Sequence, residues 1–402
     1  MNYSDQTMTT ILKALCSALT DRPPAWDDLD PADWRALPAL AKAEGVTALL
    51  VHRWQREGWP EQMPLTVRQM LKLGYYTTTA QSMFLHEELP RILQLLQPVG
   101  PVVLLKGAAL GATLYPHRSL RPLSDLDLLV PSDTFHDALQ TLYAAGYVRN
   151  QAPEIAPGID QVLSHHVQVC GGASGNIPVE LHWSMVAGAA DWRSPDLGWI
   201  WQQIEPWQPR GDGAGAPDET IAWQLTPTAQ LLYLSAHIML QHGGAQARLI
   251  WLYDLHLLLT QRADDIDWDE VVACANAWRW SAAVYAALDA TQRCFGTPLP
   301  AAPLAALRSG DQRAARFVRR RSSMRATSML VIWPKLMALP VQARVRVAWR
   351  LVCPRPAYLR WRYQVPTERM LAPYYLFHWR RLLRSGLMSI LHALHRRSAN
   401  IS

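Results

Sequence analysis

The sequence predicts an α+β protein in which a mixed sheet lies between large N- and C-terminal helical regions. First, the 402-residue chain is 50% hydrophobic and only 18% charged, so it has enough apolar content to bury a core. Second, apolar residues recur at three- and four-residue spacing before residue 97 and again after residue 220, which is typical of helices. Third, short apolar runs between these regions alternate with turn residues and helical segments, as the strands of a sheet do.

We expect four regions along the chain. The pattern changes from helical to strand-like near residue 98, and a Pro- and Gly-rich loop at 206–219 separates the strands from further helices. The segment GTPLPAAP marks another boundary near residue 300. The regions are an N-terminal helical region (1–97), a mixed-sheet core (98–205), a helical domain (220–300) and a basic, Arg-rich helical tail (304–402).

The core consists of short strand and helix units. The apolar run at 102–105 indicates a strand, and the Ala- and Leu-rich segment that follows indicates a helix to Tyr115. A second strand is expected at 126–130, with a helix after it. The segments 165–170 and 177–183 indicate two strands joined by the turn GGASGN, and this hairpin makes the sheet mixed.

The sequence gives no indication of secretion or of a membrane span. Asp5 stands where a signal peptide carries basic residues, and no run of about eighteen apolar residues occurs. The five cysteines are scattered without C-x-x-C spacing, which argues against a disulfide framework and against structural zinc. We therefore expect a soluble, cytoplasmic protein.

Charge is distributed unevenly along the chain. The net charge is +6, but the segment from Arg308 to the C-terminus carries +18 and the rest carries −12. Such a tail is suited to nucleic acid, to peripheral contact with anionic lipid, or to an acidic partner. Alternatively, the arginines line exposed helix faces and pair partly with the acidic body.

The sharpest motif is Asp125-Leu-Asp127, at the start of the strand expected at 126–130. Residues i and i+2 of a strand project from the same face, so both carboxylates point one way. Two like charges so close favour a cation between them, and oxygen ligands on a short strand suit Mg²⁺ with phosphate oxygens. The alternative is a solvated strand start in which Asp125 caps a turn.

A third carboxylate lies on the strand expected at 177–183. Glu180 and His182 share one face of that strand, and apolar neighbours occupy the other. Beside the first two carboxylates, Glu180 would hold a second metal or take a proton from an attacking hydroxyl. An ordinary amphipathic edge strand fits the same pattern.

Candidate anion-binding residues precede the Asp motif. Lys106 and Gly107 follow a strand and open a helix, which offers a cation, a close-approach glycine and free N–H groups to a triphosphate. Arg118 and Arg121 lie in the next connection, where they either clamp phosphate oxygens or decorate the surface.

These motifs, in this order, resemble the uncharacterised bacterial nucleotidyltransferase family, whose catalytic fold is similar to that of DNA polymerase beta. The resemblance rests on Leu105-Lys106-Gly107, Tyr115, the segment RPLSDLDLLV that begins at Arg121, and Glu180-Leu-His182-Trp183. It continues in HIMLQHGG at 237–244, RLIWLYDLHLLL at 248–259 and CPRPAYLRWRY at 353–363, so it covers roughly residues 102–363.

The resemblance implies an enzyme with a polymerase beta-like nucleotidyltransferase core at 98–205. It would move a nucleoside monophosphate from an NTP to an acceptor hydroxyl on a small molecule, peptide or protein, with two Mg²⁺ ions and release of pyrophosphate. Asp125, Asp127 and Glu180 would be the catalytic and metal-binding residues. Gly107 would lie against the triphosphate, with Lys106 and Arg121 on its phosphates.

The chain departs from the wider superfamily at Ala108, where a Ser or Gly commonly follows the glycine. Without that hydroxyl, a second hypothesis is a catalytically weak, nucleotidyltransferase-like adaptor or binding protein of a biosynthetic or regulatory gene cluster. Retention of all three carboxylates opposes it. A third hypothesis is an RNA-directed nucleotidyltransferase that uses the basic tail.

Two histidines are candidates for a substrate pocket, His182 and His237, although a structural core role also fits His237. His237 and His242 are five residues apart, which misses the i, i+4 spacing of two ligands on one helix face, so we expect no zinc there. We expect Asp254 to pair with such a histidine across the helices, as a structural contact.

Overall fold

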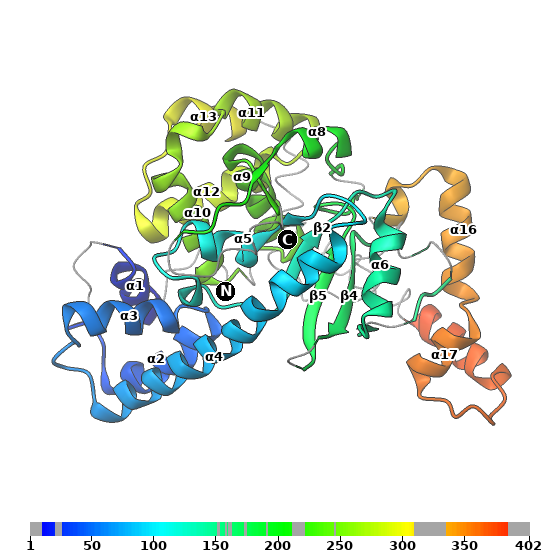
Figure 1. The fold of residues 1–402 in the computed structure, drawn as a ribbon, viewed down its shortest axis with the longest axis horizontal. Helices are drawn as coiled ribbons and strands as arrows, with labels where there is room; N and C mark the ends of the chain where they lie inside the picture. Colours follow the sequence, from blue (N-terminus) through cyan, green and yellow to red (C-terminus); the bar gives the residue numbers. More distant parts are fainter. Residues whose placement is uncertain are drawn as a thin grey trace, which may run out of the picture.

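The computed structural model describes residues 10–20, 26–150, 153–156, 159, 163–172, 175–189, 192–210, 222–244, 247–308 and 335–384. At its centre is a seven-stranded mixed sheet with helices packed on both faces (Figure 1). The predicted α+β class, with a mixed sheet between helical regions, is confirmed.

The sheet combines parallel and antiparallel neighbours in the order β3-β4-β5-β2-β1-β7-β6. β2 is parallel to β5 and β1 is parallel to β7, whereas the other neighbours are antiparallel. The strands are β1 (Val103–Leu104), β2 (Leu126–Leu129), β3 (Val148–Arg149), β4 (His166–Gly171), β5 (Ile177–His182), β6 (Ile204–Pro206) and β7 (Trp223–Leu225).

The strands predicted from apolar runs are present within a residue or so of their expected limits. β4 and β5 form the expected antiparallel hairpin, closed where Gly171 pairs with Ile177. The short strands β3, β6 and β7 were not predicted. Because β7 pairs with β1, the sheet continues beyond residue 205, where we expected the core to end. Residues 211–219 of the expected loop lie outside the described residues.

Helices account for most of the described chain outside the sheet. Before the sheet they are α1 (Thr10–Ala18), α2 (Pro31–Ala43), α3 (Thr47–Glu57) and α4 (Leu65–Leu96). Between strands lie α5 (Lys106–Thr113), the 3₁₀ turn η1 (Arg118–Leu120), α6 (Phe135–Ala144) and α8 (Leu197–Gln202). After β7 come α9 (Pro227–Ala236), the π-helical η2 (His237–Gln241), α10 (Leu249–Gln261), η3 (Ala263–Asp265), α11 (Trp268–Ala277), α12 (Ser281–Phe295), α13 (Ala301–Arg308), α16 (Val341–Val352) and α17 (Pro356–Tyr363).

Several helices begin at residues that satisfy their first N–H groups. The Asp30 side chain accepts from the N–H groups of Ala32 and Asp33 ahead of α2, and Pro31 occupies the first turn. Thr226 and Pro227 start α9 in the same way, with the Thr226 hydroxyl accepting from Ala229. α9 therefore begins shortly after β7 in the sequence, and it packs against this strand.

Two large apolar clusters cover the two faces of the sheet. Leu126 and Leu128 of β2 pack with the second half of α4 and with α6. Leu129, one residue out of phase, joins the other cluster, which holds most of the remaining helices. Asp127 shares the face of Leu129, so the sheet alternation directs its carboxylate toward the helical side opposite α4 and α6.

The N-terminal helices and the helices after β7 share one of these clusters. Ala14 and Leu15 of α1 belong to the same buried group as Ala287 and Leu288 of α12, and α1 packs directly against α12. The expected regions 1–97 and 220–300 therefore form one helical body around the sheet. The 32-residue α4 leads from this body to the opposite face of the sheet.

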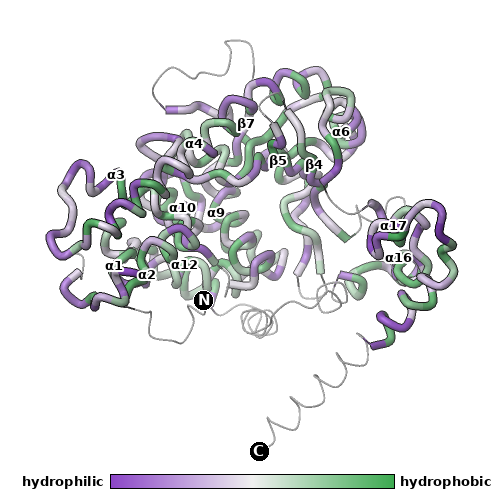
Figure 2. Tube along the Cα trace, turned by 90° about the horizontal axis from the view of Figure 1, so that it is seen from below, coloured by the Kyte–Doolittle hydropathy of each residue, from purple (hydrophilic) through white to green (hydrophobic). Residues whose placement is uncertain are grey.

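The described part of the tail lies beside the β4 and α6 side of the molecule (Figures 1 and 2). Its α16 packs through Val347 on Ala156 and Ile159 in the loop before β4. Lys335 donates to the carbonyl of Leu163 at 2.6 Å. Residues 309–334 and 385–402 of the expected tail lie outside the described residues. Across the described chain, each helix is too short or too polar to span a bilayer.

Candidate functional site

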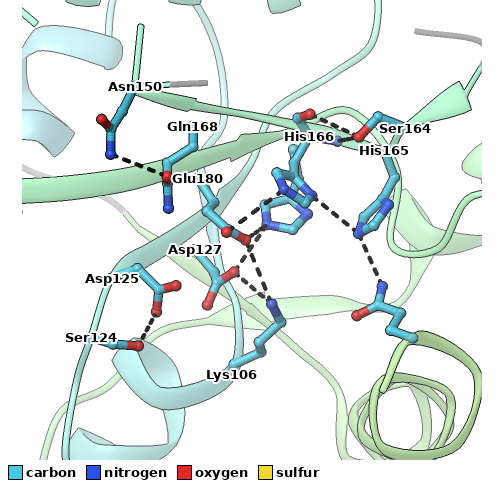
Figure 3. A network of polar contacts seen from close by, with 12 residues as sticks. Lys106, Ser124, Asp125, Asp127, Asn150, Ser164, His165, His166, Gln168 and Glu180 are labelled. Atoms are coloured by element: carbon cyan, nitrogen blue, oxygen red, sulfur yellow. Dashed lines mark hydrogen bonds and ion pairs between the residues drawn. The ribbon is translucent and has the colours of Figure 1, made fainter. Parts of the chain in front are cut away.

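The strand register brings the predicted carboxylates together on one face of the sheet. Asp127 of β2 lies directly opposite Glu180 of the parallel strand β5. His166 of β4 lies opposite His182 of β5, two residues further along. Because side chains alternate along a strand, these four side chains gather on one face at three adjacent strands. Figure 3 shows Asp127, Glu180 and His166 close together there.

Lys106 lies among these carboxylates. It begins α5 immediately after β1, and its Nζ is 2.7 Å from Asp127 Oδ1 and 3.9 Å from Glu180 Oε2. Burial alone would raise the pKa of Asp127, but Lys106 and His182 together hold that pKa well below its usual range. Asp127 is therefore ionised and paired inside the protein.

The pKa of Asp125 is shifted in the opposite direction. Burial, followed by the charges of Asp127 and Glu180, raises the pKa of Asp125 to about 6. Its carboxylate accepts a hydrogen bond from the hydroxyl of Ser124 at 2.9 Å. A half-buried carboxylate that has two others nearby and an elevated pKa is a position where a divalent cation would be stabilised.

Within the described residues, the potential ligand atoms that converge around Asp127 are not those of the three carboxylates that the sequence singled out. One oxygen or nitrogen each from Asp127, Glu180 and His182 lies within 4.8 Å of the others. His182 Nε2 is 3.0 Å from Asp127 Oδ1 and 3.5 Å from Glu180 Oε2. Asp125 is not a member of this set. His182, which we expected to line a substrate pocket, is instead one of the converging ligand residues.

His237 is connected to the same polar network through Gln241. Its Nδ1 contacts Gln241 Oε1 at 2.7 Å, and both residues lie in the π-helical η2. Gln241 Nε2 lies 3.0 Å from His165 Nε2 and donates to the carbonyl of Met185. Widened helical turns are frequent at functional sites, and this one directs Gln241 to His165, just before β4.

Sequence reasoning missed His165, His166 and Gln241. A signal for His166 was available, because antiparallel strands joined by a short turn place the His-His pair opposite His182. The sequence contains no comparable signal for Gln241, because its contact with His165 depends on how η2 packs beside the residues that precede β4.

Arg121 and Gly107, which we expected beside the triphosphate, contact other groups of the protein in the structure. Arg121 Nε and Nη2 donate to the buried carboxylate of Asp254 at 2.8–3.1 Å, and Tyr115 donates to that carboxylate at 2.6 Å. A Cβ at Gly107 would lie 2.6 Å from Leu123 Cδ2 and 3.1 Å from Arg121 Nη1, so this glycine permits close packing of the connection before β2.

One assignment changes in consequence. The expected pairing of Asp254 with a histidine is wrong, because Asp254 binds Arg121 and Tyr115. Arg118 is exposed in η1 and lines a small pocket with His86 and Trp207 on the α4 side. Phosphate contacts by Arg118, Arg121 and Gly107 stay predictions.

The fold and the site together define an α+β protein with a carboxylate, lysine and histidine centre on one face of a mixed sheet. The sequence model of a family described as uncharacterised nucleotidyltransferase matches residues 30–296, about two thirds of the chain. The chain belongs to this family, which confirms the resemblance, and membership supports nucleotidyl transfer as the general activity. The match begins at α2 and ends after α12, so it includes α2, α3 and α4 of the N-terminal region and leaves out α1 and the tail. No curated protein and no solved structure matches the chain.

Proposed function

We propose that the protein transfers a nucleoside monophosphate from an NTP to an acceptor hydroxyl of a small molecule, peptide or protein, and releases pyrophosphate. Family membership supports the reaction class. The observation that carries the proposal for this chain is the in-register pair of Asp127 and Glu180 with Asp125 beside it at an elevated pKa. A polymerase beta-like core for the sheet is part of the proposal.

The donor set fits Mg²⁺. Asp125, Asp127 and Glu180 offer hard oxygen ligands. After burial, the charges of Asp127 and Glu180 contribute to the raised pKa of Asp125, and a bound cation would offset both effects. These three residues would hold the metal, two ions in all, with the triphosphate. When bound, Mg²⁺ would neutralise charge on the attacking and leaving oxygens.

The protein's own groups have separate tasks in this proposal. Lys106 supplies a buried cation beside Asp127, where it would contact phosphate oxygens. Glu180 is the most exposed member of the Asp127, Glu180 and His182 set, with 16% of its side chain accessible, so it would face the acceptor hydroxyl and orient or deprotonate it. His166 Nε2, 3.6 Å from Glu180 Oε1, would fix the orientation of that carboxylate.

Calorimetric titration with ATP, GTP, CTP and UTP, with and without Mg²⁺, tests the nucleotide site. We expect Mg²⁺-dependent binding of at least one NTP, weakened tenfold or more by Asp125→Asn. This variant leaves the Lys106–Asp127 pair intact. Asp137→Asn, an exposed aspartate on α6, is the matched control and should bind like the wild type. Absence of NTP binding, or equal binding by Asp125→Asn, would contradict the proposal.

One observation favours the adaptor hypothesis as a second candidate. Lys106 already neutralises Asp127, and the Arg121 guanidinium is engaged with Asp254, so two expected phosphate ligands have intramolecular partners. Binding of NTP without pyrophosphate release across a broad acceptor screen would favour the adaptor. Pyrophosphate release with one acceptor would exclude it.

A further inference from the structure

Three histidine rings meet at the edge of the site, beyond the carboxylates. His165 precedes β4, His166 begins β4 and His182 ends β5. Their ring centroids are 4.6 Å, 4.9 Å and 5.4 Å apart, and one nitrogen of each ring lies within 4.8 Å of the others. Figure 3 shows His165 and His166 on the side of Glu180 away from Asp125.

The hydrogen bonds of this cluster leave ring nitrogens unused. His182 directs Nε2 to Asp127, and its Nδ1 is buried without a hydrogen-bond partner among the described residues. The Nδ1 of His165 is buried without such a partner too, whereas its Nε2 lies 3.0 Å from Gln241 Nε2. Most buried polar atoms in proteins have a partner, so the unpartnered Nδ1 of His182 needs an explanation.

The geometry of the cluster is that of metal ligands. Histidines that bind a metal with one nitrogen usually donate the other N–H to a carboxylate, and His182 and His166 direct their Nε2 atoms to Asp127 and Glu180. His166 Nδ1 lies 3.2 Å from His165 Nε2. Two nitrogens bound to one tetrahedral zinc ion at about 2.0–2.1 Å are separated by about 3.3–3.4 Å.

We propose that His165, His166 and His182 bind a divalent transition metal ion of the class that prefers imidazole, with Zn²⁺ as its representative. This site is distinct from the oxygen-rich Mg²⁺ site proposed at the aspartates, because nitrogen and oxygen donors favour different ions. Three protein ligands leave a coordination position for water or a substrate oxygen, as in catalytic zinc sites. The ion would also hold His166 and His182 in place against Glu180 and Asp127.

The test is a titration of the chelator-treated, full-length protein with Co²⁺, followed by its visible absorption, and then displacement by Zn²⁺. We expect one equivalent to bind and to produce absorption of a nitrogen-coordinated ion. His165→Gln and His166→Gln should each weaken binding tenfold or more. His136→Gln, an exposed histidine on α6, is the matched control and should bind like the wild type.

Two further measurements keep the result unambiguous. Saturating Zn²⁺ should raise the Tm of the wild type and of His136→Gln but not that of His165→Gln, which also reports whether each variant folds. Asp125→Asn should keep its Co²⁺ affinity even where it loses Mg²⁺–NTP binding, so this proposal and the proposed function can fail separately. No saturable Co²⁺ binding by the wild type, or binding unaffected by both histidine variants, would overturn the metal site and leave a hydrogen-bonded histidine cluster.

Discussion

Lys106 combines a strained backbone with a buried charge. Its φ of 47° lies in the left-handed region that residues other than glycine rarely adopt. Such conformations persist where surrounding contacts fix them, and they gather at functional sites. The ion pair with Asp127 is one such contact, so the position of this lysine depends on its carboxylate partner.

The Lys106–Asp127 pair leads to a prediction on stability. Asp127→Asn should lower the free energy of unfolding by about 3 kcal/mol, because it leaves Lys106 buried without a charged partner. Lys106→Met should have a similar effect through Asp127, and the double variant should recover part of the loss. Urea unfolding of the three variants gives the coupling energy. Strictly additive losses would show that the pair contributes nothing.

Asp125 should show the opposite behaviour. Its pKa in the folded protein, about 6, lies above that of an unfolded aspartate, so its ionised form destabilises the fold at pH above 6, and this penalty disappears as pH falls toward 4. Asp125→Asn should therefore raise stability by about 1–3 kcal/mol at pH 7.5 and by much less at pH 4.5. Thermal melts at both pH values check this, and equal Tm differences would contradict it.

The same pKa predicts the pH dependence of binding. Mg²⁺–NTP binding by the wild type requires ionised Asp125, so affinity should fall as pH drops below about 6. Calorimetry between pH 5 and 8 measures the profile. A flat profile would remove Asp125 from the metal-binding set.

At the residue scale, local periodicity was the reliable guide. The i, i+2 rule was enough to predict that Asp125 and Asp127 share one strand face and that Glu180 and His182 share another. That the two strands meet at one site was implied by the family resemblance, and the register of β2 and β5 brings Asp127 opposite Glu180. The partner of Arg121 was not predictable, because Asp254 is 133 residues away in sequence and reaches it only through the packing of α10.

At the scale of elements, the Arg121–Asp254 pair ties the connection before β2 to α10. Arg121 lies four residues before Asp125, so its anchoring sets where the Asp motif begins. Both side chains are almost inaccessible, at 8% and 0% exposure, and the carboxylate also accepts from Tyr115. The pair thus joins the site to the helical body.

Breaking this tie should weaken the fold. Asp254→Ala should cost about 3–5 kcal/mol of stability, because it leaves the Arg121 guanidinium buried and unpaired. Arg121→Lys keeps the charge but loses the two-pronged contact, and should cost less. Arg118→Lys, at an exposed position in η1, is the control and should change stability little. Denaturant unfolding compares the stability of the three variants. An unchanged free energy of unfolding for Asp254→Ala would contradict this structural role of the Arg121–Asp254 pair.

Element prediction succeeded where the pattern was strong and failed where pairing alone defines the element. The β4–β5 hairpin was predicted because apolar alternation and a glycine-rich turn coincide. β6 and β7 are three residues each, and they are strands only because they meet each other and β1. The π-helical turn η2 was also missed, since its sequence continues the helical pattern of α9.

At the scale of the molecule, the chain consists of an acidic body and a basic tail that are packed by separate apolar clusters. The acidic body is held by two large clusters that, within the described residues, extend no further than Leu307. The tail rests on the loop before β4 through a small cluster, and α16 presents Val341, Val345 and Trp349 to solvent at 62–68% exposure. Apolar side chains alternate there with arginines, a pattern that suits an acidic partner, anionic lipid or nucleic acid.

Truncation after Leu307 separates the two parts. The shortened chain should keep its cooperative melt with a modest loss of Tm, and its net charge should change from +6 to −12. Thermal unfolding and ion-exchange behaviour test both statements. If RNA is the acceptor, the full chain should bind it with steep salt dependence and the truncated chain should not. Loss of the melt would show that the tail belongs to the core.

The packing of α1 on α12 has a consequence for how the protein is made. The partner helix begins more than 260 residues after α1 ends, when about 70% of the chain has been synthesised. Until then the buried face of α1, including Ala14 and Leu15, lacks its final partner, and the emerging chain carries exposed apolar surface that chaperones recognise. The first described helix to leave the ribosome is thus among the last to reach its native surroundings.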